Sequence, residues 1–256
     1  MKESDLIYGI MASLGKEEYS IVYMKYLLEP FNVSDSSLRT TLSRMMEKGL
    51  LKSRKTGRLV FYSFEEKGLR IRGNVSYSFH TSDWSKWDNT WWGYVFTIPS
   101  GDKNLRYKVR TKLEKYRFVS LYPGYWIRPF HESEKIDEKF NDLMNSGYGH
   151  LIKVEFISEL TKEGISELWK IESVNEDFET GLKHLNESIL KLPNVDPQEA
   201  FRLKMLIGNE IVHLLFRDPL LPKCFLPNNW KGEELRKLFS DWEKAVNIKA
   251  ELFWNI

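Results

Sequence analysis

The segment FNVSDSSLRTTLSRMMEKGLL, residues 31–51, has the pattern of a helix with one core-facing side and one exposed side. Ser34 or Asp35 is suited to cap the start of this helix, and Gly49 is suited to end it. The core side carries Val33, Leu38, Leu42 and Met45. The opposite side carries small hydroxyl residues and one carboxylate, flanked by arginines, namely Ser36, Arg39, Thr40, Ser43, Arg44 and Glu47. Small hydroxyl residues permit close approach and arginines reach phosphates or guanine edges, so this side is suited to contact DNA.

The next residues, LLKSRKTGRLVFYSFEEKGLRI (50–71), predict a hairpin with a basic tip. Two strands are expected, at 50–55 and 59–64, joined by a turn in which Gly57 supplies a positive φ. The cations at and beside the turn are Arg54, Lys55 and Arg58. Such side chains are suited to touch a phosphate backbone.

Two further helices are expected before this pair of elements, at 4–14 and 17–28, from the spacing of their apolar residues. Three helices followed by a hairpin is the order of a winged helix-turn-helix, whose third helix enters the major groove. The predicted DNA contacts are Ser36, Arg39, Thr40, Ser43, Arg44, Arg54, Lys55 and Arg58. The alternative is a winged helix that is used only for protein contacts.

The charge distribution favours the DNA interpretation. The chain has a formal charge of only +2, yet residues 31–74 hold ten basic and four acidic residues. A local basic block on a nearly neutral protein is typical of a nucleic-acid-binding module. A lysine-rich solvated surface would give the same count.

Composition places the chain among globular proteins. It has 256 residues, of which 42% are hydrophobic and 29% charged. Cys224 is the single cysteine, so an intramolecular disulfide and a four-thiolate metal site are excluded. No apolar run reaches membrane-spanning length, and the N-terminus lacks the features of a signal peptide. We expect a soluble, cytoplasmic protein without a membrane partner.

The rest of the chain predicts two more parts and an α+β fold. After a polar linker at 74–90, strand and helix signals alternate as β-α-β-β-α-β over 91–159, the ferredoxin-like arrangement. Residues 160–256 show helical signals only, with long helices expected at 169–191, 198–216 and 233–250. The winged helix then occupies 1–73. Within the aperiodic segment 217–232, we expect a rigid corner in which Asp218 caps a helix and Trp230 is packed.

Four segments, in order along most of the chain, resemble the PaaX-type transcriptional repressors of phenylacetate degradation. They are SLRTTLSRMMEKGLL with the wing TGRLVFYSF, SLYPGYWIRP, RDPLLP, and FLPNNWKG with the helix that follows it. The resemblance implies a winged helix, a ferredoxin-like middle domain and a helical C-terminal domain. It also implies a homodimer on a pseudo-palindromic double-stranded DNA operator. In such regulators an aryl-CoA thioester, such as phenylacetyl-CoA, releases the protein from DNA.

A CoA thioester presents phosphates and an adenine, so its site needs cations and a stacking ring. The segment SLYPGYWIRPFH (120–131) and the helix expected before it offer this mixture. The predicted effector-binding residues are Arg106, Arg110, Tyr122, Trp126, Arg128 and His131. The alternative is that Tyr125 and Trp126 belong to the core and that Arg128 forms a structural ion pair.

Motifs of catalysis are missing from the sequence. There is no nucleophile elbow, Walker loop or dinucleotide fingerprint, and the five histidines are scattered. The middle domain also resembles the ferredoxin-like, CRISPR-associated nucleases, which place a metal-binding aspartate at the end of their first strand. Here that strand ends at 96–99, without a carboxylate before Asp102. We therefore expect no enzymatic activity, metal or cofactor. A metal-dependent nuclease, and a regulator with a different effector, remain alternatives.

Overall fold

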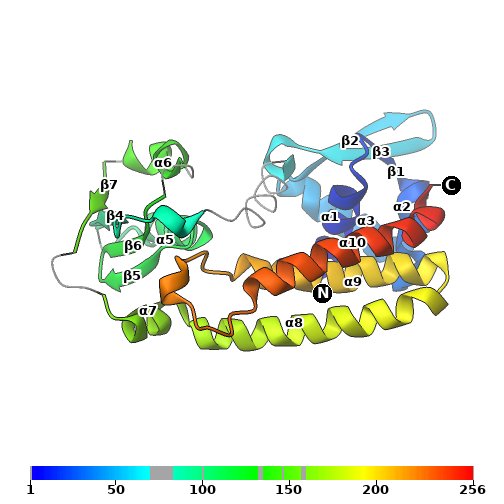
Figure 1. The fold of residues 1–256 in the computed structure, drawn as a ribbon. Coiled ribbons are helices and arrows are strands. Elements are labelled where there is room, and N and C mark those ends of the chain that lie inside the picture. The colour runs from blue at the N-terminus through cyan, green and yellow to red at the C-terminus, as the bar shows by residue number, and fades with distance from the viewer. Residues whose placement is uncertain are drawn as a thin grey trace. The chain divides into compact units, whose positions relative to one another are not determined.

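The computed structural model describes residues 2–69, 83–99, 101–131, 135–145, 147–156 and 160–255 (Figure 1). Its contacts divide the chain into two compact units. The first, here the winged-helix unit, comprises residues 1–80, 177–217 and 231–256; the second, the sheet unit, comprises 81–176 and 218–230. Residues 74–82 of the predicted linker lie outside the described residues. None of the described helices combines the length and apolarity that crossing a membrane requires.

The winged-helix unit begins with three helices and a small antiparallel sheet whose strand order is β1-β3-β2. The elements are α1 (Glu3–Leu14), β1 (Tyr19–Ser20), α2 (Ile21–Leu28), α3 (Asp35–Glu47), β2 (Leu51–Thr56) and β3 (Leu59–Phe64). The hairpin turns at Gly57, whose φ of 60° is the positive value that glycine was expected to supply. The predicted order of three helices and a wing is confirmed.

The second helix begins later than its apolar spacing predicts. Tyr19 and Ser20 form strand β1 instead of helix, because they pair with Tyr62 and Phe61 of β3. The hydroxyl of Ser20 then accepts a 3.1 Å hydrogen bond from the backbone N–H of Tyr23 and caps α2. A strand pairing across more than forty positions therefore overrides the local helical pattern.

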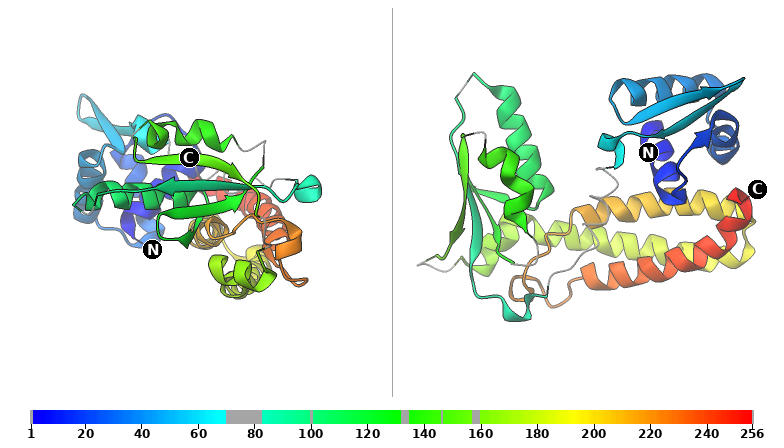
Figure 2. Two further views of the ribbon diagram at one scale, coloured as in Figure 1. Left: turned by 90° about the vertical axis from the view of Figure 1, so that its left-hand side faces the viewer. Right: turned by 90° about the horizontal axis from the view of Figure 1, so that it is seen from above.

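The sheet unit has a four-stranded antiparallel sheet of order β5-β6-β4-β7. Its elements are β4 (Trp91–Phe96), α5 (Lys103–Lys115), β5 (Val119–Tyr122), β6 (Tyr125–Pro129), α6 (Ile136–Met144) and β7 (Gly149–Val154). Both helices lie on the same side of this sheet (Figure 2), where Val109, Leu113 and Phe140 pack against Tyr94 and Trp126. The ferredoxin-like fold and the α+β class are confirmed.

The other side of the sheet is covered by residues from later in the chain. Trp91 and Ile127 pack there against Ile165 and Trp169 of α7 (Lys162–Trp169), and against Leu221. Helix α7 is separate from the helix expected at 169–191, because Lys170 adopts a left-handed conformation between the two. Alternate positions of β4 and β6 thus supply two hydrophobic cores, one on each side of the sheet.

Three long helices follow: α8 (Ile171–Lys191), α9 (Pro197–Phe216) and α10 (Gly232–Trp254). Helices α9 and α10 pack along each other, and residues 177–191 of α8 belong to the same unit (Figure 1). Gly181 permits α8 to approach α9 closely, because a Cβ atom at this position would lie 2.7 Å from Leu214 Cδ1 of α9. Helix α10 runs four residues beyond the predicted Ala250, and its last residues, Phe253 and Trp254, are buried.

The corner at 217–232 is built differently from the prediction. Asp218 is not the N-cap of any helix in the described part of the chain; it is buried, and its Oδ1 accepts a 2.8 Å hydrogen bond from the backbone N–H of Leu220. Its carbonyl oxygen also accepts a 2.7 Å hydrogen bond from Arg117 Nε. Leu220 has a φ of 51°, so the carboxylate stabilises a strained turn. Trp230 packs against the core of the sheet unit, as expected.

Candidate nucleic-acid interface

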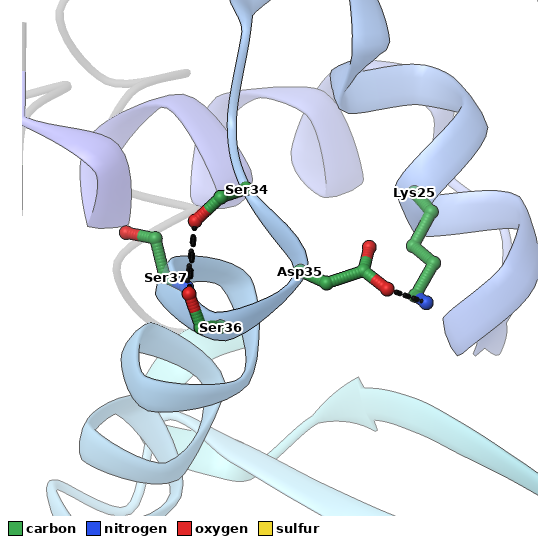
Figure 3. Close-up of polar contacts among 5 residues, drawn as sticks. All are labelled: Lys25, Ser34, Asp35, Ser36 and Ser37. Atoms are coloured by element: carbon green, nitrogen blue, oxygen red, sulfur yellow. Dashed lines mark hydrogen bonds and ion pairs between the residues drawn. The ribbon is translucent and has the colours of Figure 1, made fainter.

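The start of α3 is held by side chains on both sides of it (Figure 3). Ser34 is the N-cap, and its Oγ accepts a 3.2 Å hydrogen bond from the backbone N–H of Ser37. An ion pair between Lys25 and Asp35 joins α2 to the first turn of α3. The Ser37 hydroxyl also donates to Glu3 of α1. These contacts orient α3 with respect to the other two helices.

The outer side of α3 is the predicted DNA-contacting face. Leu38, Leu42 and Met45 are buried beneath it. All five predicted contacts on this helix are exposed, namely Ser36, Arg39, Thr40, Ser43 and Arg44. The Thr40 hydroxyl donates to the Ser36 carbonyl oxygen at 2.9 Å, which keeps it close to the helix. The Ser43 hydroxyl donates to Glu47 Oε1 at 3.4 Å, so the face combines hydroxyl groups and two arginines with one carboxylate.

The two arginines of this face, Arg39 and Arg44, form no hydrogen bond or ion pair with the described residues. Their guanidinium groups are therefore available to phosphates and to guanine edges.

The wing differs from α3, because one of its three predicted contacts is already engaged. Arg54 donates to both carboxylate oxygens of Glu18, at 3.0 and 2.6 Å, and lies over the ring of Phe61. These hydrogen bonds lower the pKa of Glu18 and raise that of Arg54. Sequence reasoning missed Glu18, which lies 36 positions from Arg54 without a pattern connecting them.

Lys55 and Arg58 remain exposed at the wing tip, and no described residue pairs with either of them. Of the predicted DNA contacts, the basic residues without a partner among the described residues are therefore Arg39, Arg44, Lys55 and Arg58. Arg54 instead anchors the wing to the segment before α2.

The predicted effector residues are only partly brought together. Arg110 lies over the ring of Trp126, 5.9 Å from its centroid, and Trp126 itself is buried. Arg106 donates to the carbonyl oxygen of Ile98 at 3.1 Å. Tyr122 is 64% exposed at the end of an edge strand. The His131 ring lies against Trp84, and its Nε2 is 3.0 Å from the carbonyl oxygen of Asp83.

Arg128 is placed inside the fold. Only 1% of the residue is exposed, and its Nη1 donates to the carbonyl oxygen of Tyr116 at 2.8 Å. Its guanidinium also lies over the ring of Phe118. These contacts agree with the structural alternative for this arginine.

The first carboxylate after β4 along the sequence has a structural role. Asp102 caps α5, and its Oδ1 accepts a 2.9 Å hydrogen bond from the backbone N–H of Leu105. Among the described residues, no three His, Cys, Asp or Glu side chains are grouped so that they could hold a metal ion.

Known proteins resemble the chain along almost its whole length. Residues 9–68 match the family of PaaX-like proteins, residues 84–165 the central Cas2-like domain of PaaX proteins, and residues 168–256 the C-terminal domain of PaaX-like proteins. The transcriptional repressor PaaX of Escherichia coli is 25% identical over 244 residues, which are 91% of this chain and 75% of the relative.

A solved structure, an uncharacterized protein Rv0674 from Mycobacterium tuberculosis, has a similar fold. It superposes with a TM-score of 0.56 at 20% identity, over 91% of this chain and 90% of that one. Because three successive family domains cover the chain in the order that its segments predict, the protein belongs to the PaaX family.

Proposed function

We propose that the protein is a transcriptional repressor that binds double-stranded DNA through α3 and the wing. The observation that carries this proposal is the exposed outer side of α3, where Arg39 and Arg44 flank hydroxyl residues and are themselves unpaired among the described residues. The name of the E. coli relative supports the same function. Arginine contacts to phosphates supply affinity, and contacts to base edges supply specificity.

The proposed assembly is a homodimer on a pseudo-palindromic operator. A dimer presents two copies of α3 to successive major grooves, about 34 Å apart or at a multiple of that distance. The resemblance to PaaX-type repressors supports this assembly.

The proposed effector is an aryl-CoA thioester, with phenylacetyl-CoA as the first candidate. A ligand that binds better to a DNA-incompetent arrangement shifts the population away from the operator. Arg128 and Trp126 are poor candidates for direct ligand contacts, since both are buried. Arg106, Arg110, Tyr122 and His131 remain the candidate contacts in this region.

The test is fluorescence anisotropy on DNA from upstream of the protein's own gene, at two salt concentrations, with and without phenylacetyl-CoA. We expect specific binding that weakens steeply with salt and is abolished by the thioester. Specific DNA binding that phenylacetyl-CoA does not change would support the repressor proposal and contradict the proposal of this effector. If neither this DNA nor genome-wide selection gave salt-dependent binding, the DNA-binding proposal would fail in favour of protein contacts. Cleavage that requires Mg²⁺ or Mn²⁺ would favour the nuclease alternative.

A further inference from the structure

Helix α5 of the sheet unit concentrates positive charge. Its thirteen residues include one acidic residue, Glu114. They include six basic residues: Lys103, Arg106, Lys108, Arg110, Lys112 and Lys115. The formal charge of this helix is therefore +5, and that of residues 31–74 is +6, in a chain whose total is +2. The remaining residues sum to −9, so positive charge is segregated into two places.

The cations of α5 are poorly neutralised. Lys112 has an ion-pair partner, Asp142 of α6. Within the described ranges, the other five basic side chains of the helix have no carboxylate at ion-pair distance. Lys103, Lys108 and Tyr107 all point outward, and Tyr107 is 72% exposed. The inward side is apolar, with Val109 and Leu113 in the core, so the fold presents the basic side to the outside.

Positive charges crowd at the C-terminal end of α5. Lys115 and Lys139 both place their ammonium groups over the ring of Tyr116, at 5.3 and 5.7 Å. Burial lowers the pKa of Lys115, and the charges of Lys112 and Lys139 lower it further. The helix dipole favours lysines at this end but does not account for the basic residues in the first half of α5. A bound anion would relieve the repulsion between like charges.

We propose that the outer side of α5 binds the phosphodiester backbone of double-stranded DNA and so extends the proposed function beyond the winged helix. Lys103 and Lys108 project from the convex surface of a helix, whereas small-molecule sites are concave. At 1.5 Å per residue, the thirteen residues of α5 span about 20 Å. Because each step of the duplex rises about 3.4 Å along its axis, that length covers about six base-pair steps. The contacts supply affinity without reading sequence.

The test compares two matched double variants of the full chain. Lys103→Gln with Lys108→Gln removes two unpaired cations of α5, and glutamine retains helix propensity. Lys183→Gln with Lys237→Gln makes the same change in net charge on α8 and α10, where both lysines are exposed. Binding to a generic 40-base-pair duplex is measured by anisotropy over a range of salt concentrations.

We expect the α5 variant to bind severalfold more weakly. The slope of log K against log salt should become shallower by about 0.9 for each lost phosphate contact. The control variant should match the wild type. Equal salt slopes for the wild type and both variants would overturn the proposal. Equal losses of DNA affinity in the two variants would also overturn it, because they would indicate a general effect of net charge.

Two further arms separate this inference from the function proposed for the winged helix. The double variant Arg39→Ala, Arg44→Ala tests α3 alone. If this variant binds the duplex as tightly as the wild type and the α5 variant binds it more weakly, α5 binds DNA and the winged helix does not. Phenylacetyl-CoA binding is measured for the α5 variant by calorimetry. Weaker thioester binding with an unchanged DNA slope would assign the α5 cations to the phosphates of a CoA ligand and overturn the DNA assignment.

Discussion

The hydroxyl of Tyr26 in α2 donates a 2.8 Å hydrogen bond to the carbonyl oxygen of Phe253, 227 positions away, and the two rings stack with centroids 4.6 Å apart. The adjacent Tyr23 hydroxyl donates to the carbonyl oxygen of Trp254. Phe201 of α9 packs against Phe253 and against Phe31, which follows α2. The last turn of α10 therefore supports the first helix of the helix-turn-helix and the turn before α3.

Replacing Phe253 with alanine should destabilise the winged-helix unit. A buried phenylalanine truncated to alanine typically costs about 3–5 kcal/mol of unfolding free energy. Urea unfolding followed by tryptophan fluorescence measures this loss. Leu252→Ala is the matched control, since Leu252 is 70% exposed one position earlier, and it should change stability little. Equal effects at the two positions would show that the contact with Tyr26 does not hold α10 in place.

Replacing Arg44 with alanine should weaken operator binding and leave the fold intact. Loss of a base-contacting arginine costs about 1–3 kcal/mol, or roughly 5- to 150-fold in affinity. Anisotropy gives the affinity, and circular dichroism shows whether the helix content is retained. Lys237→Ala, on the exposed side of α10, serves as the control. Wild-type affinity in a folded Arg44 variant would remove this residue from the interface.

Arg54 and Glu18 should act on DNA binding as a unit. If Arg54 works by anchoring the wing, Glu18→Ala and Arg54→Ala should weaken operator binding by similar factors, and the double variant should be no weaker than either. The pair is exposed, so the stability to unfolding should change little in any of the three variants. Stronger binding in the Glu18→Ala variant would instead mean that Glu18 withholds Arg54 from phosphate.

Replacing Tyr94 with phenylalanine should reduce the alkaline instability of the sheet unit. The Tyr94 hydroxyl is buried without a hydrogen-bond partner among the described residues, and burial raises its pKa. Tyrosine in the unfolded chain ionises at about pH 10, and Tyr94 in the fold ionises only at a higher pH, so stability falls as pH rises through this range.

Chemical denaturation at pH 7 and pH 11 measures the effect. At pH 7 the Tyr94→Phe variant should be at least as stable as the wild type, because an unpaired buried hydroxyl is removed. From pH 7 to pH 11 it should lose less stability than the wild type. The exposed Tyr107→Phe should lose as much as the wild type does. A larger loss in the Tyr94 variant would contradict the assignment.

The sequence alone determined the elements whose patterns are local. Three such elements are the N-cap at Ser34, the apolar spacing of α3 and the glycine turn of the wing. Each depends on residues that are close together in the sequence, so propensity and periodicity predict them. The order of strands and helices over 91–159 likewise predicted the ferredoxin-like sheet, because few topologies suit that order. The predicted recognition face is exposed as its periodicity required.

Tertiary structure decided what depends on residues distant in sequence. The late start of α2 follows from strand pairing with β3, and the extra turn of α10 follows from the burial of Phe253 and Trp254. Glu18 accepts hydrogen bonds from Arg54, and the Tyr116 carbonyl oxygen accepts one from Arg128, so one predicted DNA contact and one predicted effector contact already have partners within the chain. The charge of a side chain follows from the sequence, but its partner depends on which polar group the fold brings within hydrogen-bond reach. For the buried Arg128, an unpaired guanidinium would also be costly.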